Sequence, residues 1–440
     1  MEQIDLIIEA QTILPLTQTQ TVLENHAIAI DQGKIKAIAP TASLHAQYQA
    51  KEVVKRPHHA LLPGFVNAHT HVPMNILRGL ADDYPLMVWL QEHIFPAEGR
   101  FMNESFAYNG TLLAIAEMLR SGTTCFNDMY YFSENITTAT LEAGMRACIG
   151  ATILDFPTPY AKTPDDYFSR AEHLFSHFKQ AHLISFAVAP HAIYTVSDEN
   201  LKRCRALAQA YQLPISMHVQ ETQTEVEASV ANTGQRPFRR LVDLGLVDDR
   251  FMAVHMTQIN DEDVTLLQAS HAHIVHCPQS NMKLASGICP ITRLQEAGIN
   301  VAIGTDSTAS NNDLNMLEEM RTATLLAKVS TQSATAIPAY TALRMGTYHG
   351  AKALGLEKII GSLEVGKAAD LISIDLDQIE MLPLYHPHSQ IIYASNRENV
   401  IDTWVNGRAL MRNRELTTLD EEKLKATARA WAKKLTAAHV

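Results

Sequence analysis

The sequence lacks any long apolar run. No stretch of its 440 residues approaches the roughly 18 consecutive apolar residues that a membrane-spanning helix needs. The opening residues, MEQIDLIIEA, carry acidic side chains where an export signal would have basic residues and then a long apolar core. We therefore expect neither a membrane span nor an export signal.

Cysteine is scarce and shows no paired spacing. The chain has five cysteines, an odd number, and no C-x-x-C pair. This pattern argues against a disulfide framework and favours reduced thiols in a cytoplasmic protein.

Two phosphate-binding patterns are also missing. No G-x-G-x-x-G follows any strand-like segment, which leaves a dinucleotide cofactor without support. The segment Gly361–Lys367 comes close to a P-loop, but Ala368 stands where that pattern requires serine or threonine. We predict a turn there.

Basic residues are fewer than acidic residues. The 36 lysines and arginines face 47 aspartates and glutamates, which gives a formal net charge of −11. A protein of this sign repels phosphate backbones and anionic lipids, so we expect no nucleic-acid partner and no membrane partner. The hydrophobic share of 46% and the charged share of 19% are ordinary for a globular protein, and the length allows two domains.

The sequence pattern changes twice along the chain. Residues 1–60 and 361–440 contain short strand-like runs, whereas residues 61–360 alternate strand-like and helix-like segments. Two apolar runs flank Asp31–Lys34, and Asn406-Gly407 marks a second hairpin turn before a helix over about Leu419–Ala438. We predict a small β-sandwich built from both chain termini beside a larger central domain.

Eight segments of the central region are short, apolar and rich in β-forming residues. They are residues 61–71, 123–128, 147–156, 183–191, 214–222, 251–258, 273–281 and 299–307. Amphipathic segments such as Ser105–Arg120, Glu199–Ala210 and Asp261–Ala269 separate most of them. The alternation predicts an α/β fold, a (β/α)8 TIM-type barrel with its active site at the carboxyl ends of the strands. A doubly wound open sheet fits almost as well.

Four candidate metal ligands end three of these strands. His69 and His71 are two positions apart on the first strand, so both imidazoles can face one point. A lone H-x-H is more simply explained by ordinary core or surface histidines, but His218 ends the fifth strand and Asp306 the eighth. Three imidazoles and one carboxylate suit zinc, iron or manganese and leave a position for water. We predict a metal site.

The expected number of metal ions is one. A two-metal site of this kind needs a bridging anionic ligand near the end of the fourth strand. That strand ends Val188-Ala189-Pro190-His191, without a lysine or glutamate in place.

Glu221, three residues beyond His218, is the candidate proton shuttle. A carboxylate beside the open coordination position can take a proton from water held by the metal and pass it to a leaving group. Glu225 and Glu227 are rivals in the same loop, but only Glu221 is near enough to His218.

His255 ends the sixth strand and faces the same end of the barrel. We expect it to hydrogen-bond the attacking water or the developing oxyanion, although a packed core histidine is the alternative. Asp306 is expected to accept the proton of the attacking hydroxide as well as to bind the metal.

Eight short motifs run almost from end to end of the chain. They are P-G-F-V-N-A-H-T-H at Pro63–His71, F-P-A-E at Phe95–Glu98, A-P-H at Ala189–His191, H-V-Q-E at His218–Glu221, S-N-M-K-L-A-S-G at Ser280–Gly287, G-T-D-S at Gly304–Ser307, S-N-N-D-L at Ser310–Leu314 and G-S-L-E-V-G-K-A-A-D at Gly361–Asp370. Together they resemble the amidohydrolase superfamily, and within it the 5′-methylthioadenosine/S-adenosylhomocysteine deaminases.

This resemblance implies a set of site residues. The metal ligands would be His69, His71, His218 and Asp306, with one divalent ion, zinc being expected. The substrate contacts would be Glu98, His191, Glu221 and Asp306, and the catalytic residues Glu221, His255 and Asp306.

The implied activity is hydrolytic deamination of an adenosine-type nucleoside, 5′-methylthioadenosine and/or S-adenosylhomocysteine, to the inosine analogue and ammonia. Glu98 would hold the ribose hydroxyls, and Trp89 or Met87 would line an apolar slot for the 5′-thioether. The arginines with which family members often bind the larger tail have no residue-by-residue match here.

Several other functions fit part of the pattern. A guanine deaminase or a triazine chlorohydrolase shares much of it, but chloride leaves without a proton, so an acid at Glu221 favours an amine leaving group. A catalytically inactive, assembly-type member would typically lose metal ligands, and all four are present here. A second zinc deaminase design needs P-C-x-x-C, which this sequence lacks. A homo-oligomer is compatible with the sequence, which gives no sign of an interface.

Overall fold

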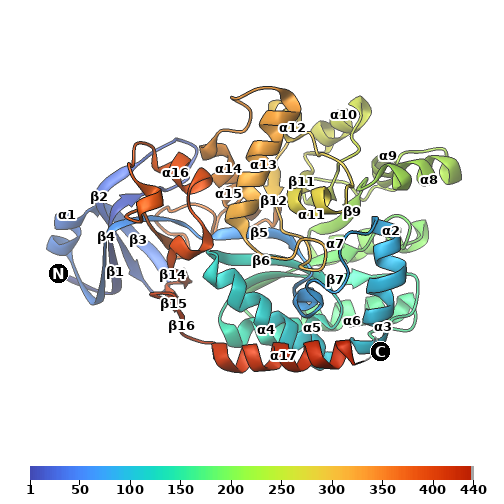
Figure 1. Cartoon of the computed structure of the whole chain (residues 1–440), viewed down its shortest axis with the longest axis horizontal. Coiled ribbons are helices and arrows are strands. Elements are labelled where there is room, and N and C mark those ends of the chain that lie inside the picture. The colour runs from blue at the N-terminus through green and yellow to red at the C-terminus, as the bar shows by residue number, and fades with distance from the viewer. Residues whose placement is uncertain (438–440) are drawn as a thin grey trace. The chain divides into compact units, whose positions relative to one another are not determined.

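Eight buried apolar segments form one sheet in the computed structural model, which describes residues 1–437 (Figure 1). Its strands are β5 (Phe65–Thr70), β6 (Thr123–Tyr130), β7 (Arg146–Ile153), β8 (Ile184–Pro190), β9 (Ile215–Val219), β10 (Phe251–His255), β11 (His273–His276) and β12 (Val301–Ile303). Neighbours in the sheet are neighbours in the chain, from β5 to β12. The pairs from β7 to β12 are parallel, and burial on both faces explains the continuous apolar runs.

The sheet closes between its first and last strands. Thr70, at the end of β5, forms a parallel bridge with Asp306, just after β12, and the Asp306 N–H donates to the His69 carbonyl at 3.0 Å. Gly304 permits this approach, because a Cβ there would lie 2.7 Å from the backbone nitrogen of His69. An open doubly wound sheet has no such bridge, so the prediction of a (β/α)8 barrel is confirmed.

Helices separate the strands as the sequence predicts, and all eight strands occur where they were expected. The helices of this region are α2 (Leu86–Val88), α3 (Phe95–Phe101), α4 (Glu104–Arg120), α5 (Ser133–Ala143), α6 (Pro164–His177), α7 (Asp198–Tyr211), α8 (Gln223–Thr233), α9 (Pro237–Asp243), α10 (Asp261–Ser270), α11 (Pro278–Lys283) and α12 (Ile291–Glu296). A 3-10 helix, η1 (Val72–Leu77), follows β5, and a π-helical turn, η2 (Trp89–Ile94), joins α2 to α3.

Several strand ends differ from the sequence-based expectation, and two of these differences bear on the candidate site. Strand β6 continues to Tyr130, two residues beyond Asp128. Strand β9 ends at Val219 instead of Thr222, because Gln220 adopts a positive φ of 50° and turns the chain. Both differences move side chains at the carboxyl end of the barrel, where the candidate site lies.

The second sheet is built from both ends of the chain. Its strands are β1 (Glu2–Ile13), β2 (Leu23–Asp31), β3 (Lys34–Pro40), β4 (Tyr48–Pro63), β13 (Leu371–Asp375), β14 (Val400–Val405), β15 (Arg408–Arg412) and β16 (Glu415–Leu416), in the order β16-β15-β14-β13-β4-β1-β2-β3. The join is the antiparallel pair of β4 and β13, with Leu371 opposite Pro63. Ile8, Leu61 and Trp404 belong to its buried core. The predicted second β domain from both termini is confirmed, and so are both hairpin turns.

The expectation of only short strands in the first sixty residues is wrong. Strands β1 and β4 have 12 and 16 residues. They pair in parallel from Glu2 opposite Tyr48 to Ile13 opposite Leu61, and this long pairing extends both strands.

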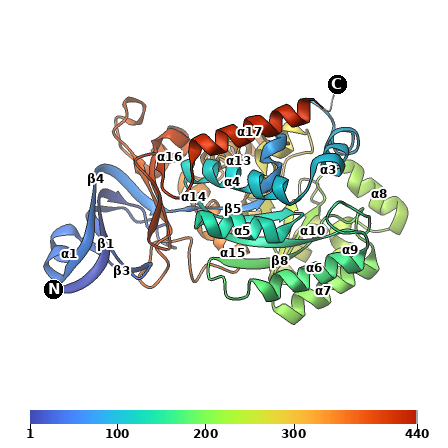
Figure 2. The ribbon, with the colours of Figure 1, turned by 90° about the horizontal axis from the view of Figure 1, so that it is seen from below.

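The remaining helices follow the barrel strands in sequence. They are α13 (Met316–Thr331), α14 (Ala339–Met345), α15 (Tyr348–Ala353), α16 (Pro387–Tyr393) and α17 (Glu421–Thr436), and α1 (Thr41–Gln47) precedes β4. Helix α17 lies along α4 in both views of the ribbon, and the ring of Trp431 meets that of Phe106 edge-on at 5.4 Å (Figures 1 and 2). The predicted terminal helix is thus present, although Ala438, its expected end, lies outside the described residues.

The chain groups into two compact units. One consists of Met1–Asn67, Ala116–Cys125 and Asn315–Leu419, and the other of Ala68–Ile115, Phe126–Leu314 and the chain from Asp420 onward. All candidate site residues belong to the second unit. Within residues 1–437, no helix combines the length and apolar character needed to cross a membrane. The five cysteines are free thiols in buried positions.

Candidate active site

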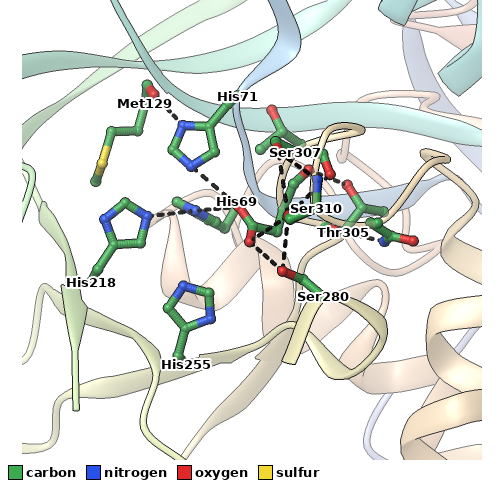
Figure 3. Close-up of polar contacts among 12 residues, drawn as sticks. His69, His71, Met129, His218, His255, Ser280, Thr305, Ser307 and Ser310 are labelled. Atoms are coloured by element: carbon green, nitrogen blue, oxygen red, sulfur yellow. Dashed lines mark hydrogen bonds and ion pairs between the residues drawn. The ribbon is translucent and has the colours of Figure 1, made fainter. Parts of the chain in front are cut away.

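Four side chains converge at the carboxyl end of the barrel strands. One ligand atom from each of His69, His71, His218 and Asp306 lies within 4.8 Å of every other. The rings of His69, His71 and His218 lie close together in Figure 3, and the Nε2 atoms of His69 and His218 are 3.1 Å apart. Asp306 Oδ1 is 3.5 Å from His69 Nε2 and 3.2 Å from His71 Nε2. The structure therefore brings together all four predicted ligands.

The donors of this group fit a divalent metal. Nδ1–H of His218 donates to the His191 carbonyl at 2.8 Å, and Nδ1–H of His71 to the Met129 carbonyl at 2.5 Å, so each Nε2 lone pair faces the group. Burial lowers the pKa of His69 to about 4 and that of His218 well below its ordinary value, so these two imidazoles are neutral at neutral pH. Burial also acts to lower the pKa of His71, but its contact with Asp306 outweighs burial and raises it. Spacings of 3.1–3.5 Å suit atoms arranged about 2.0–2.2 Å from one ion.

Asp306 is held so that one oxygen faces the histidines. Its Oδ2 accepts hydrogen bonds from Ser280 Oγ at 2.6 Å and Ser310 Oγ at 3.1 Å, while Oδ1 faces His69 and His71. Burial raises the pKa of this carboxyl, but contacts with the two histidines outweigh burial and hold the pKa well below its ordinary value. A carboxylate oriented in this way is a ready metal ligand.

Glu221 lies beside the group in a buried position. Its Oε1 accepts from Ser286 Oγ at 3.2 Å, and its Oε2 is 3.7 Å from His255 Nε2. Burial raises the pKa of Glu221, which makes its carboxyl a better proton acceptor than an exposed glutamate. Glu227 is exposed, and the carboxylate of Glu225 binds backbone N–H groups, so the geometry favours Glu221 over both rivals.

A cavity opens over these residues. Its walls include Trp89, Glu98, Tyr130, His191 and Tyr194 together with His71, His218, Glu221, His255 and Asp306. Tyr130 donates to Glu98 Oε1 at 2.6 Å, and burial raises the pKa of Glu98 to about 7. Burial also lowers the pKa of His191 to about 3, so this imidazole is neutral. Met87 lines a neighbouring cavity instead, beside Tyr194.

The comparisons with known proteins agree with this geometry. The sequence profile of the Amidohydrolase family matches residues 60–410. The chain belongs to this family. This amidohydrolase is 47% identical over 433 residues to the 5-methylthioadenosine/S-adenosylhomocysteine deaminase of Saccharophagus degradans, a match that covers 98% of this chain and 97% of the relative.

Solved structures resemble this amidohydrolase over nearly its whole length. An adenosine deaminase from Xanthomonas campestris with bound zinc superimposes with a TM-score of 0.98 at 49% identity and 99% coverage of both chains. The zinc complex of atrazine chlorohydrolase TrzN from Arthrobacter aurescens gives a TM-score of 0.91 at 21% identity, covering 97% of this chain and 99% of its own. That second likeness shows a common fold alone. Family membership and the donor group support a divalent metal.

Sequence reasoning about this amidohydrolase missed three polar residues of the site. Ser280, in α11, and Ser310, in the turn after β12, hold Asp306. Each opens a motif that carries the family resemblance, but neither was assigned a role. Tyr130, which binds Glu98, had a usable signal. It lies two residues beyond Asp128, so a longer β6 would have placed both side chains on one face.

Proposed function

We propose that this chain is a metal-dependent aminohydrolase that deaminates an adenosine-type nucleoside. The substrate class is 5′-methylthioadenosine and/or S-adenosylhomocysteine, and the products are the inosine analogue and ammonia. Full-length relatives at 40–47% identity that carry the corresponding name support this substrate class. The observation that carries the proposal is the buried Glu221 beside the three-histidine, one-aspartate group, since an amine leaving group needs a proton donor there.

One zinc ion is the proposed cofactor, held by His69, His71, His218 and Asp306. When bound, it would supply a water activated for nucleophilic attack near neutral pH. Strand β8 ends at Pro190, followed by His191, and offers no lysine or glutamate that would bridge to a second ion.

The proton steps fall to this chain's own carboxylates. Asp306 accepts the proton of the attacking nucleophile, and Glu221 delivers a proton to a ring nitrogen of the purine. Water thus adds at C6, and ammonia leaves after the amino nitrogen is protonated, which balances the hydrolysis. His255 donates a hydrogen bond to the oxygen that adds at C6.

Two further residues are proposed to hold the nucleoside. Glu98, fixed by Tyr130, would accept hydrogen bonds from the ribose hydroxyls. His191, a neutral imidazole, would hydrogen-bond the purine. Trp89 contributes an apolar wall next to Glu98.

The proposal extends to the protein's surroundings. Its partner is a small-molecule nucleoside, and the net charge of −11 argues against nucleic acid. Five free thiols support a cytoplasmic location. Homo-oligomerisation is compatible with this function.

The test combines a substrate panel with one substitution. Zinc-loaded protein is incubated with methylthioadenosine, S-adenosylhomocysteine, adenosine, guanine and a chlorotriazine, and ammonia and chloride are measured. We expect ammonia from the adenosine-type nucleosides, and a loss of about 10²- to 10⁴-fold in Glu221→Gln with metal retained. Chloride release, ammonia from guanine alone, or near-normal turnover by Glu221→Gln would refute the proposal.

A further inference from the structure

Glu225 is a buried carboxylate that has no part in the proposed chemistry. It lies in the first turn of α8, where Thr222 Oγ1 caps the helix by accepting from the Glu225 N–H at 3.2 Å. In a capping box the glutamate would return to the backbone N–H of the capping residue. Here it reaches further back along the chain: Oε1 accepts from Gln220 N at 2.9 Å and Oε2 from Glu221 N at 2.8 Å.

The end of β9 explains why these two N–H groups need an acceptor. The strand stops at Val219, and the positive φ of Gln220 turns the chain out of the sheet. Both Gln220 and Glu221 are buried, and a buried N–H without an acceptor is costly. The two oxygens of one side chain satisfy both groups, and these bonds favour the ionised carboxylate against burial, which raises the pKa of Glu225 to about 7.

The backbone carbonyl groups of Gln220 and Glu221 are hydrogen-bonded as well. Thr257 Oγ1 donates to the Glu221 carbonyl at 2.7 Å, and the Thr257 N–H donates to the Gln220 carbonyl at 3.1 Å. The Glu221 peptide is therefore fixed between Glu225 and Thr257. Its side chain leaves this fixed backbone toward Ser286 and His255.

We propose that Glu225 is a positioning residue that sets the orientation of Glu221 through these two backbone hydrogen bonds. The inference rests on the proposed function, because it assigns Glu225 a role only through the proton transfer by Glu221. Displacing a reacting group by about 1 Å can cost on the order of 100-fold in rate. Loss of the Glu225 carboxylate is accordingly expected to lower kcat/KM by about 10- to 100-fold.

Glu225→Gln is the sharpest substitution, because it keeps the size of the side chain. One amide oxygen still accepts a backbone N–H, while the amide NH2 opposes the other. Glu227→Gln is the matched control, since Glu227 is exposed on the same helix and bonds only to Gln223 among the contacts described. We expect the control to keep full activity, and both variants to keep the wild-type metal content.

A double-mutant cycle with Glu221→Gln separates positioning from a general structural role. If Glu225 acts through Glu221, Glu225→Gln costs 10- to 100-fold in the wild-type background and less than about twofold in the Glu221→Gln background. An equal loss in both backgrounds, a loss of metal, or a Glu225→Gln enzyme within twofold of wild type would overturn the inference. If Glu225→Gln does not fold, Glu225→Asp, which keeps the charge but reaches less far, takes its place in the same cycle. Wild-type protein that releases no ammonia from any nucleoside would defeat the proposed function instead.

Discussion

Two buried aspartates, one in each compact unit, differ in how their charge is balanced. Asp402, on β14, accepts from Arg56 Nε at 2.6 Å and Arg56 Nη2 at 2.7 Å. Ser373 Oγ at 2.6 Å and the Asn413 N–H at 3.0 Å complete its hydrogen bonds. Its charge is matched within the fold.

Asp306 is paired with histidines instead of an arginine. Among the described residues its ion-pair contacts are His69 and His71, and its other oxygen takes hydrogen bonds from Ser280 and Ser310. The adjacent His218 is held as a neutral imidazole by burial. A buried carboxylate is most favourable beside a group that is permanently positive, and histidines are not. A divalent ion would supply that charge.

The difference between the two aspartates separates a structural role from a functional one. A buried charge with a complete set of partners stabilises the fold, whereas a group of donors that lacks its cation is built for a ligand. This comparison can be tested, because substitution at each site should affect a different property.

The largest expected effect is on activity. Asp306→Ala removes one proposed metal ligand, so metal binding and deamination should fall by more than the roughly 10- to 100-fold that loss of a supporting partner costs. Metal analysis and ammonia release measure these effects. An Asp306→Ala variant that binds metal and deaminates its substrate at the normal rate would contradict the functional role assigned to Asp306.

The next effect is on stability. Arg56→Met leaves Asp402 buried without its cation, and breaking a buried pair commonly costs 3–5 kcal/mol. Because Asp402 keeps two other donors, we expect about 3 kcal/mol, measured by urea unfolding, with kcat unchanged below the unfolding transition. Lys51→Met is the control: its pair with Asp5 is exposed and should contribute about 0–1 kcal/mol. Equal losses from both substitutions would show that the buried pair has no special role.

The same pair predicts a pH dependence. Burial raises the pKa of Asp402, but the bonds from Arg56 and the other donors outweigh burial and hold the pKa below its ordinary value. The stability from this lowered pKa is fully present above the unfolded value of about 3.9 and is lost as pH falls through the folded value. The difference in unfolding free energy between wild type and Arg56→Met should therefore be full near neutral pH and shrink in acid. A difference that grows in acid would contradict the assigned direction.

The smallest expected effect concerns the serines behind Asp306. Ser280→Ala removes the 2.6 Å bond to Oδ2 but leaves that of Ser310, so zinc affinity should fall by about 10-fold. Competition with a chromophoric chelator measures the affinity. Ser176→Ala, on the exposed face of α6, should have no effect. An unchanged affinity in Ser280→Ala would mean that the carboxylate needs no support from this residue.

The sequence predicted those parts of the site that depend on position along a strand. His69 and His71 were found because side chains two apart share a face, and His218 and Asp306 because barrel strands end at one rim. The contacts of Ser280, Ser310 and Thr257 were not predicted, because they depend on how a helix and loops from separate parts of the chain meet in space.

The hydrogen bonds of Glu225 could not be predicted from the sequence either. Thr222 and Glu225 have the spacing of a capping box, but the direction taken by the Glu225 carboxylate depends on the positive φ of Gln220. No residue type in the motif encodes that turn, so its consequence for Glu221 appears only in three dimensions.

The bridge between Thr70 and Asp306, which closes the barrel, has a consequence for the order in which the metal ligands come together. Two of the four ligands come with the first barrel strand, but the fourth arrives only when the last strand docks beside it. A growing chain therefore cannot complete its set of metal ligands until Asp306, residue 306 of 440, has been synthesised. A bound ion shared by His69, His71 and Asp306 would link the first and last strands of the barrel. Its release would destabilise the pairing of these two strands first.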